Sequence, residues 1–167
     1  DLFASIKIRR PELQAAFQKP PVEEFTTDNR NLEISIELPQ PEACIRYSGV
    51  TLSGIRVGES PEWLKELLTA AGIRPINNVV DVTNFVLMET GQPLHAFDAD
   101  KITGKKVIVK TLEEGTPFVT LDGVERKLSS GDLMICNTEA PMCIGGVFGG
   151  LHSGVSENTV NVFLESA

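Results

Sequence analysis

The second half of the chain consists of short apolar runs separated by turn residues, a pattern typical of β-rich folds. Two runs, 117–121 and 124–128, flank Asp122-Gly123, a dipeptide favoured in tight β-hairpins. β-Branched and other apolar residues also dominate the runs 106–112, 133–136, 142–147 and 159–165. Short strands of this kind must bury their apolar faces against a second layer. The first half of the chain must therefore supply residues that cover them.

One clear helix signal precedes the β-rich half. Ser60 suits the N-cap position of a helix, and Pro61 suits its first turn. Glu62 then places a negative charge at the positive end of the helix dipole. Gly72 suits the left-handed conformation that ends many helices. Between these signals, apolar residues recur at helical spacing, at Leu64, Leu67, Leu68 and Ala71. We predict a helix from residue 62 to about residue 71.

The run 78–90 admits two interpretations. Its valines favour a strand, yet Val79, Val82 and Val86 also share one face of a helix. The uninterrupted length of the run and Gly91 at its end favour the helix. We therefore predict a second helix here.

The beginning of the chain carries weaker signals. A candidate helix covers 12–18, and apolar residues alternate with polar ones over 32–38, as in a strand with one buried face. Residues 45–57 are rich in β-branched residues and are interrupted by two glycines, which indicates a bent strand pair or a bulged strand. We predict an α+β fold: a β-rich three-layer body of mixed sheets packed on two helices. A partly irregular lead-in at 1–40 precedes the domain itself at 41–167.

Composition excludes several classes of protein. The formal charge is −8 and no long basic cluster is present, so this chain alone should bind RNA poorly. No apolar run reaches about 18 residues and no basic-then-apolar leader occurs, so neither a membrane span nor a signal peptide is expected. Cys44, Cys136 and Cys143 form no paired motif, which disfavours a disulfide framework or a zinc site and is typical of a reducing cytoplasm.

His95 is the first candidate for chemistry. A histidine on a loop beside carboxylates can act as a general base, an orienting donor or a metal ligand. The residues alone favour a structural histidine that holds the Gln92-Pro93 turn. Asp98 and Asp100 are better explained as turn-forming residues before the next segment.

Two further groups each have two interpretations. Thr83 and Asn84 lie in the run predicted to be helical, where both residue types are unfavourable. They either supply polar groups to a pocket, or are a threonine bonded to the helix backbone and an exposed asparagine. The glycines of 145–150 either let the backbone approach a ligand closely or form a tight β-corner. The candidate binding residues of this segment are Gly146, Phe148 and Gly149.

Glu165 ends the last predicted strand. Val160, Val162 and Leu164 mark one face of that strand, and Phe163 and Glu165 mark the other. If the first face is buried, Glu165 projects beside Phe163 toward the opposite side, where its carboxylate can accept a hydrogen bond from a ligand hydroxyl. An ordinary surface glutamate is the simpler interpretation.

Five segments occur in an order that indicates a known family. They are PEACIRYSGV, GIRPINNVVDVTNFVLMETGQPLHAFD, LDGVERKL, GGVFGGLHSGV and NVFLE, and they span residues 41–165. Together they resemble the central editing domain of bacterial phenylalanyl-tRNA synthetase β subunits. That resemblance implies hydrolysis of tyrosine misattached to phenylalanine tRNA. Such editing is needed because a pocket shaped for a phenyl ring cannot strongly reject an added hydroxyl.

The resemblance also assigns roles to residues. The pocket for the amino acid and the terminal adenosine receives three catalytic candidates: His95, Thr83 and Asn84. Glu165 is assigned to the tyrosine hydroxyl, with the Gly149 backbone near it. The substrate-binding candidates are accordingly Glu165, Gly149, Phe148 and Gly146, and no metal ligand is assigned. The resemblance further implies that a Thr-x-Ala element downstream of this strand completes the pocket, so we expect the chain to stop before part of its site.

Partners and cofactors follow from the same resemblance. It implies binding to the 3′ end of phenylalanine tRNA, assembly with an α subunit into a heterotetramer, a cytoplasmic location and no membrane. It implies no cofactor in this segment. ATP and magnesium are expected at the synthetic site, elsewhere in the parent enzyme.

Two other functions fit parts of the sequence. The first is a non-catalytic module of the same synthetase that guides tRNA or packs against other domains. The second, unrelated to that family, is a metal-dependent hydrolase that uses His95, Asp98 and His152. The second fits least well, because HxxD spacing is common and no convincing third ligand is near.

Overall fold

A computed structural model describes residues 2–13, 16, 18 and 21–167. The chain forms two units, Asp1–Asn31 and Leu32–Ala167. Each unit is described separately. The second unit contains every predicted site residue, and the predicted domain boundary at residue 40 stays a prediction.

The first unit contains one described helix, α1, at Leu2–Arg9. This helix lies earlier in the chain than the predicted helix over 12–18. Glu12 and Leu13 are not helical, so the start of that prediction is wrong, and residues 14, 15 and 17 lie outside the described residues.

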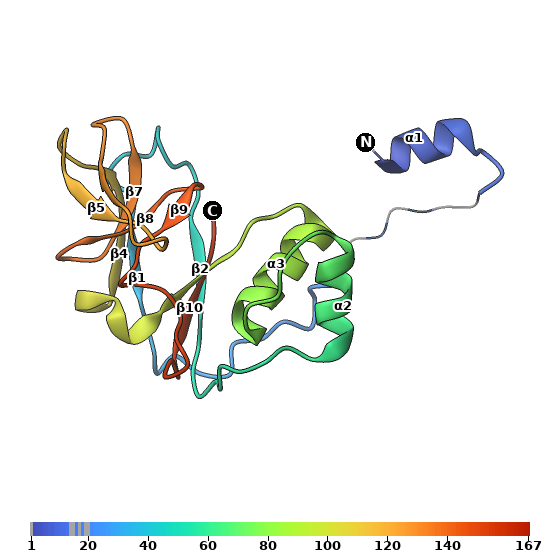
Figure 1. Ribbon diagram of the computed structural model, residues 1–167, viewed down its shortest axis with the longest axis horizontal. Coiled ribbons are helices and arrows are strands. Elements are labelled where there is room, and N and C mark those ends of the chain that lie inside the picture. The colour runs from blue at the N-terminus through green and yellow to red at the C-terminus, as the bar shows by residue number, and fades with distance from the viewer. Residues whose placement is uncertain (1, 14–15, 17, 19–20) are drawn as a thin grey trace. The chain divides into compact units, whose positions relative to one another are not determined.

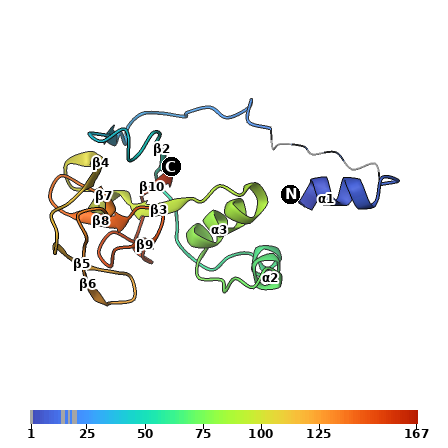
Figure 2. The ribbon, with the colours of Figure 1, turned by 90° about the horizontal axis from the view of Figure 1, so that it is seen from above.

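The second unit has three layers. The outer layer is a five-stranded sheet in the order β1-β4-β7-β8-β9, and the middle layer is a three-stranded sheet in the order β2-β10-β3. Helices α2 and α3 lie together on the far side of the middle sheet (Figure 1, Figure 2). The α+β class, β-rich and with helices packed against sheets, is therefore confirmed.

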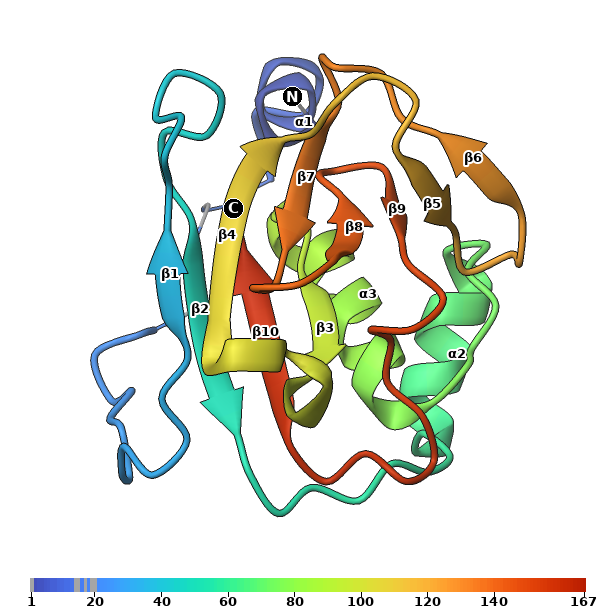
Figure 3. The same cartoon turned by 90° about the vertical axis from the view of Figure 1, so that its left-hand side faces the viewer.

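The outer sheet is mixed, because β1 pairs with β4 in parallel and the other neighbours pair antiparallel (Figure 3). Its strands are β1 (Ser35–Glu37), β4 (Lys106–Thr111), β7 (Leu133–Cys136), β8 (Pro141–Ile144) and β9 (Phe148–Gly149). Two short 3₁₀ helices precede β4: η1 (Ala99–Lys101) and η2 (Thr103–Lys105). A separate hairpin joins β5 (Pro117–Val119) to β6 (Glu125–Lys127). Gly123 has a φ of 76° in its turn, as the Asp122-Gly123 dipeptide predicts.

Both predicted helices of the second unit form. Helix α3 spans Asn78–Thr90, where the Asn77 side chain accepts hydrogen bonds from two backbone N–H groups of the first turn. Gly91 ends α3 with a φ of 76°, the left-handed conformation expected of a C-terminal glycine. The helix interpretation of the valine-rich run is therefore confirmed.

Helix α2 spans Glu62–Ala70, but the prediction of Ser60 as its N-cap is wrong. Pro61 occupies the N-cap position and provides no side-chain hydrogen bond. The Ser60 hydroxyl instead donates to the buried Asp81 carboxylate at 2.5 Å, and so connects the two helices. Trp63 of α2 and Phe85 of α3 make an edge contact at 5.8 Å between ring centroids.

The middle sheet consists of β2 (Ser48–Leu52), β3 (His95–Asp98) and β10 (Val162–Ser166). Of the two interpretations of 45–57, the bent strand pair is wrong, because the run contains a single strand, β2. The five residues of β2 pair with β10 without a register shift. The last strand starts later than the predicted Thr159, because the Thr159 N–H donates to the Ser156 carbonyl in a turn at 3.0 Å. The Thr159 hydroxyl donates to the Asp98 carboxylate at 2.7 Å. The main apolar core lies between the two sheets, where Phe97 and Phe163 pack with Val107 and Val109 of β4.

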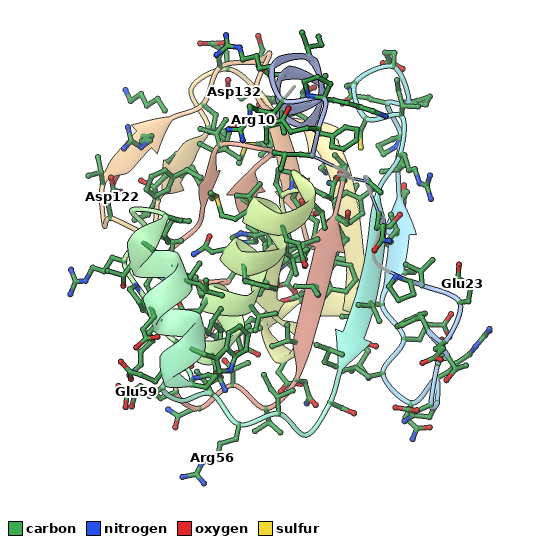
Figure 4. All side chains as sticks on the ribbon, turned by 90° about the vertical axis from the view of Figure 1, so that its right-hand side faces the viewer. Arg10, Glu23, Arg56, Glu59, Asp122 and Asp132 are labelled. Atoms are coloured by element: carbon green, nitrogen blue, oxygen red, sulfur yellow. The ribbon has the colours of Figure 1, made fainter. Side chains whose placement is uncertain are left out.

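Several charged side chains lie on the outside of this unit. Figure 4 shows Arg56, Glu59 and Asp122 projecting away from its body. Glu59 pairs with Lys65 of α2, and Asp122 pairs with Arg126 of β6. Among the described residues, no helix has the length and apolar character needed to cross a membrane.

Candidate functional site

Strand β10 lies between β2 and β3, and its register places Glu165 opposite Gly49 on one side and His95 on the other. Directly opposed residues of antiparallel strands point to the same face of the sheet. Phe163 and Phe97 are opposed in the same way and share that face. The predicted loop at His95 is wrong, because backbone pairing with β10 makes it the first residue of β3.

Glu165 is buried, with an exposed fraction of 8%, so its interpretation as an ordinary surface glutamate is wrong. The Tyr47 hydroxyl donates a hydrogen bond to Oε2 of Glu165 at 2.8 Å. Burial raises the pKa of the Glu165 carboxyl to about 7, although the hydrogen bond from Tyr47 acts in the opposite direction. The group therefore changes charge near neutral pH.

His95 lies edge-on to the Phe97 ring, with 4.5 Å between the ring centroids. Its Nε2 atom is buried and has no hydrogen-bond partner among the described residues. Burial lowers the pKa of the imidazole, which favours the neutral form at neutral pH. A neutral imidazole nitrogen without a partner can accept or donate one hydrogen bond, depending on the tautomer.

Two neighbouring cavities border these residues. The smaller one, of about 240 Å³, is lined by Glu165, His95, Cys143 and the segment 146–149. The larger one, of about 530 Å³, is lined by Thr83 and Asn84 of α3 together with His95. The two cavities share the lining residues Leu94, His95, Val147, Phe148 and Gly149.

The structure thus distributes the predicted site residues over two adjoining spaces. The smaller cavity brings together four substrate-binding candidates and His95: Glu165, Gly146, Phe148 and Gly149. The larger cavity holds Thr83 and Asn84, also with His95. Glu165 and Thr83 do not line the same cavity. His95 lies between them and borders both.

The helix residues have well-defined surroundings. The Thr83 hydroxyl donates to the Val80 carbonyl at 2.7 Å, as the interpretation of a threonine bonded to the helix backbone predicts. A hydroxyl oxygen bonded in this way still has lone pairs that can accept a hydrogen bond. Asn84 is half-buried in the cavity wall, so the predicted exposed asparagine is wrong.

The glycine segment packs closely against neighbouring parts of the domain, as the β-corner interpretation predicts, and its approach to a ligand stays a prediction. The Gly150 N–H donates to the Met142 carbonyl at 2.8 Å, and a Cβ atom on Gly150 would lie 2.6 Å from that oxygen, as in a tight β-corner. A Cβ atom on Gly149 would instead lie 3.1 Å from Cε1 of His95 and 3.4 Å from Nε2. The absence of a side chain at Gly149 therefore lets its backbone lie close against the edge of the imidazole.

Comparison with known proteins identifies the family. Residues 43–167 match the B3/4 domain family. This chain belongs to that family. The chain is 60% identical over 154 residues to the phenylalanine–tRNA ligase β subunit of Bacteroides fragilis strain YCH46, which covers 92% of the chain and 19% of that subunit. It is also 56% identical over 168 residues to the phenylalanine–tRNA ligase β subunit of Porphyromonas gingivalis. That match covers 100% of the chain and 20% of that subunit.

A solved structure is also similar to this B3/4 domain. It is an N-terminal fragment of the phenylalanyl-tRNA synthetase β subunit from Pyrococcus horikoshii, with a TM-score of 0.58 and 15% sequence identity. The match covers 80% of the chain and 42% of that fragment, and at this identity it shows the fold alone. The resemblance found in the sequence motifs is confirmed, and the chain spans about a fifth of the length of the curated relatives named above.

The geometry of the B3/4 domain argues against the metal-dependent hydrolase. His95 and Asp98 lie three residues apart on β3, so their side chains point to opposite faces of the sheet. Asp98 caps η1 and accepts a hydrogen bond from the Asp100 N–H, as its interpretation as a turn residue predicts. In the described part of the chain, no group of three His, Cys, Asp or Glu residues is arranged to hold a metal ion.

The cysteines of this B3/4 domain are free thiols. Cys136 and Cys143 are buried, and Cys44 is half-buried. Burial and the nearby Glu165 raise the pKa of Cys143, in the wall of the smaller cavity, to about 12, so it stays a thiol at neutral pH.

One residue of the site was not found from the sequence. Tyr47 lies just before β2, on the same face as Gly49, and reaches Glu165 from a position 118 residues away in the chain. Alternation along the strand places it on this face, but only the pairing with β10 shows which face carries Glu165.

Proposed function

We propose that this B3/4 domain is the editing part of a phenylalanine–tRNA ligase β subunit, and that it hydrolyses tyrosine misattached to phenylalanine tRNA. The observation that carries this proposal is the buried Glu165 carboxylate at the wall of a cavity whose opposite strand presents His95. A buried acceptor of this kind favours a ligand that donates a hydrogen bond.

Selection between tyrosine and phenylalanine follows from hydrogen bonding at Glu165. A tyrosyl side chain in the smaller cavity donates its hydroxyl to the carboxylate. A phenylalanyl side chain excludes water from the same carboxylate and donates nothing. A lost hydrogen bond to a charged group costs about 1.5–3 kcal/mol, which corresponds to roughly 10- to 150-fold discrimination.

Hydrolysis takes place at the other end of the substrate, where the ester joins the amino acid to the terminal ribose. His95 borders both cavities and orients a water molecule toward the ester carbonyl carbon. The water oxygen bonds to that carbon, the bond to the ribose oxygen breaks, and the ribose oxygen takes a proton. Thr83 and Asn84 hold the ester and the adenosine in the larger cavity, where polar groups stabilise the developing oxyanion.

The remaining partners lie outside this domain. The net charge of −8 opposes binding to RNA phosphates, so other parts of the synthetase must hold the body of the phenylalanine tRNA. An α subunit completes the enzyme as a heterotetramer in the cytoplasm. In this proposal, ATP and magnesium bind at the synthetic site elsewhere in the parent enzyme.

The test replaces Glu165 in the full-length β subunit assembled with its α subunit. Glu165→Gln keeps the size of the side chain and removes its charge, and we expect release of tyrosine from tyrosylated phenylalanine tRNA to slow about 10- to 100-fold. Glu157→Gln, at an exposed glutamate, is the matched control. Full clearance by Glu165→Gln would contradict the proposal.

A second candidate is a non-catalytic module that guides tRNA or packs against other domains. Internal bonds favour it, because Glu165 already accepts a bond from Tyr47 and Thr83 already donates to a helix carbonyl. Binding of a non-hydrolysable tyrosyl-adenosine analogue separates the two candidates. The editing domain binds the analogue, and the module does not.

A further inference from the structure

We propose that Tyr47 is a positioning residue of the editing site, which holds one oxygen of Glu165 so that the other alone receives the ligand hydroxyl. This inference rests on the proposed editing function and adds a determinant of its specificity. Tyr47 acts through Glu165 and does not itself contact the reacting ester.

The Tyr47 ring is held firmly in place. It is buried and stacks on the Phe163 ring, with centroids 6.5 Å apart and an angle of 13° between the planes. Phe163 in turn packs against Phe97 at 6.4 Å, and Phe97 contacts His95. Gly49 gives Phe163 the necessary room, since a Cβ atom there would lie 2.2 Å from the ring. A row of four rings therefore fixes both Tyr47 and His95 around Glu165.

The carboxylate lies between two spaces. Glu165 borders the smaller cavity of about 240 Å³ and also a third cavity of about 430 Å³, which Tyr47 lines as well. Tyr47 does not line the smaller cavity. Its hydroxyl donates to Oε2, whereas Oε1 has no hydrogen-bond partner among the described residues. The bond from Tyr47 thus occupies Oε2 and leaves Oε1 as the oxygen available to a donor in the smaller cavity.

The same bond favours the charged form of the acceptor. Burial raises the pKa of the Tyr47 phenol, so it stays a protonated donor, and its hydrogen bond lowers the pKa of Glu165. The other titratable groups facing these cavities are His95 and Cys143 on one side and Glu42, Cys44 and Arg46 on the other. Loss of the Tyr47 hydroxyl should therefore raise the pH at which Glu165 loses its proton and becomes a charged acceptor.

The test compares Tyr47→Phe with wild type in the full-length β subunit assembled with its α subunit. For Tyr47→Phe we expect kcat/KM for tyrosyl ester hydrolysis to fall about tenfold at pH 7, with no change for the phenylalanyl ester. The midpoint of the acid limb of the tyrosyl pH profile should move to higher pH. Thr51→Val is the matched control, because it removes a different hydroxyl hydrogen bond, the 2.7 Å bond from Thr51 of the neighbouring strand β2 to the Leu32 carbonyl. It should change neither the selectivity nor the midpoint.

The outcomes separate this inference from the proposed function. A wild-type enzyme that does not release tyrosine overturns both. An active wild type, with a Tyr47→Phe variant of unchanged selectivity and unchanged midpoint, overturns only the role of Tyr47.

A second measurement tests the role of Tyr47 without replacing it, in case the Tyr47→Phe variant fails to fold. Tyr47 is the only tyrosine of this chain, so 3-fluorotyrosine incorporated into the 167-residue chain reports on this residue alone. The fluorine resonance should shift with pH near neutrality in wild type and stay constant in Glu165→Gln. A resonance that does not respond in wild type contradicts the inference.

Discussion

Glu165→Gln should stabilise the fold at alkaline pH, because it removes a carboxylate whose ionisation is opposed by burial. The ordinary pKa of 4.5 rises to about 7 in the folded chain. Between these values the folded chain retains a proton that the unfolded chain has released, so stability falls as pH rises through this interval. At about 1.4 kcal/mol per pKa unit, the full effect above pH 7 is about 3 kcal/mol. Glutamine carries no charge and still offers Tyr47 an acceptor oxygen.

Urea denaturation of wild type and variant at several pH values tests this reasoning. The two should be nearly equally stable at pH 4.5, and the variant should exceed wild type by about 3 kcal/mol at pH 8. Glu157→Gln, at an exposed position, should show no such trend. A difference between Glu165→Gln and wild type that does not change with pH would refute the assignment of a raised pKa to Glu165.

Two further substitutions test other parts of the site. Gly149→Ala places a methyl group 2.8 Å from Leu121 Cδ1 and 3.1 Å from His95 Cε1. Leu121 is half exposed and can move, so the substitution should destabilise the fold by less than about 1.5 kcal/mol. The methyl group beside His95 should slow hydrolysis of tyrosylated tRNA about tenfold. Equal rates for the variant and wild type would contradict a role of Gly149 in the site. Thr159→Val removes the hydroxyl that donates to the buried Asp98 carboxylate and should destabilise the fold by about 1.5–3 kcal/mol in urea denaturation; an unchanged midpoint would refute this estimate.

The two helices of the second unit were the most predictable part of this fold, because local signals mark where they lie. Gly91 adopts the left-handed conformation that its place after the valine-rich run predicts. Ser60 shows the limit of such signals. Its hydroxyl could bond either to the helix N-terminus or to a buried carboxylate. In the folded structure it donates to the carboxylate of Asp81, 21 residues away.

The strands that build the site were harder to predict, since their pairing is non-local. Strand β3 has only four residues, and its order depends on hydrogen bonds to β10, more than sixty residues away in sequence. Strand β9 has two residues and no periodicity that a sequence pattern could reveal. The family resemblance named the candidate residues, but only the register shows that Glu165 and His95 are neighbours.

The burial of Glu165 connects stability with selectivity. A carboxylate in a polar, hydrated position would be cheap to ionise, but water would satisfy it whichever amino acid is bound. In its buried position, ionisation of Glu165 is unfavourable without a donor. Under the proposed editing function, the free energy lost from folding above pH 7 would therefore reappear as preference for a hydroxyl-bearing ligand. The same glutamine substitution should therefore raise stability and lower discrimination, a trade-off expected where a binding site retains an unfavourable buried group. Tyr47 limits this conflict by satisfying one oxygen of the carboxylate while leaving the other to the substrate.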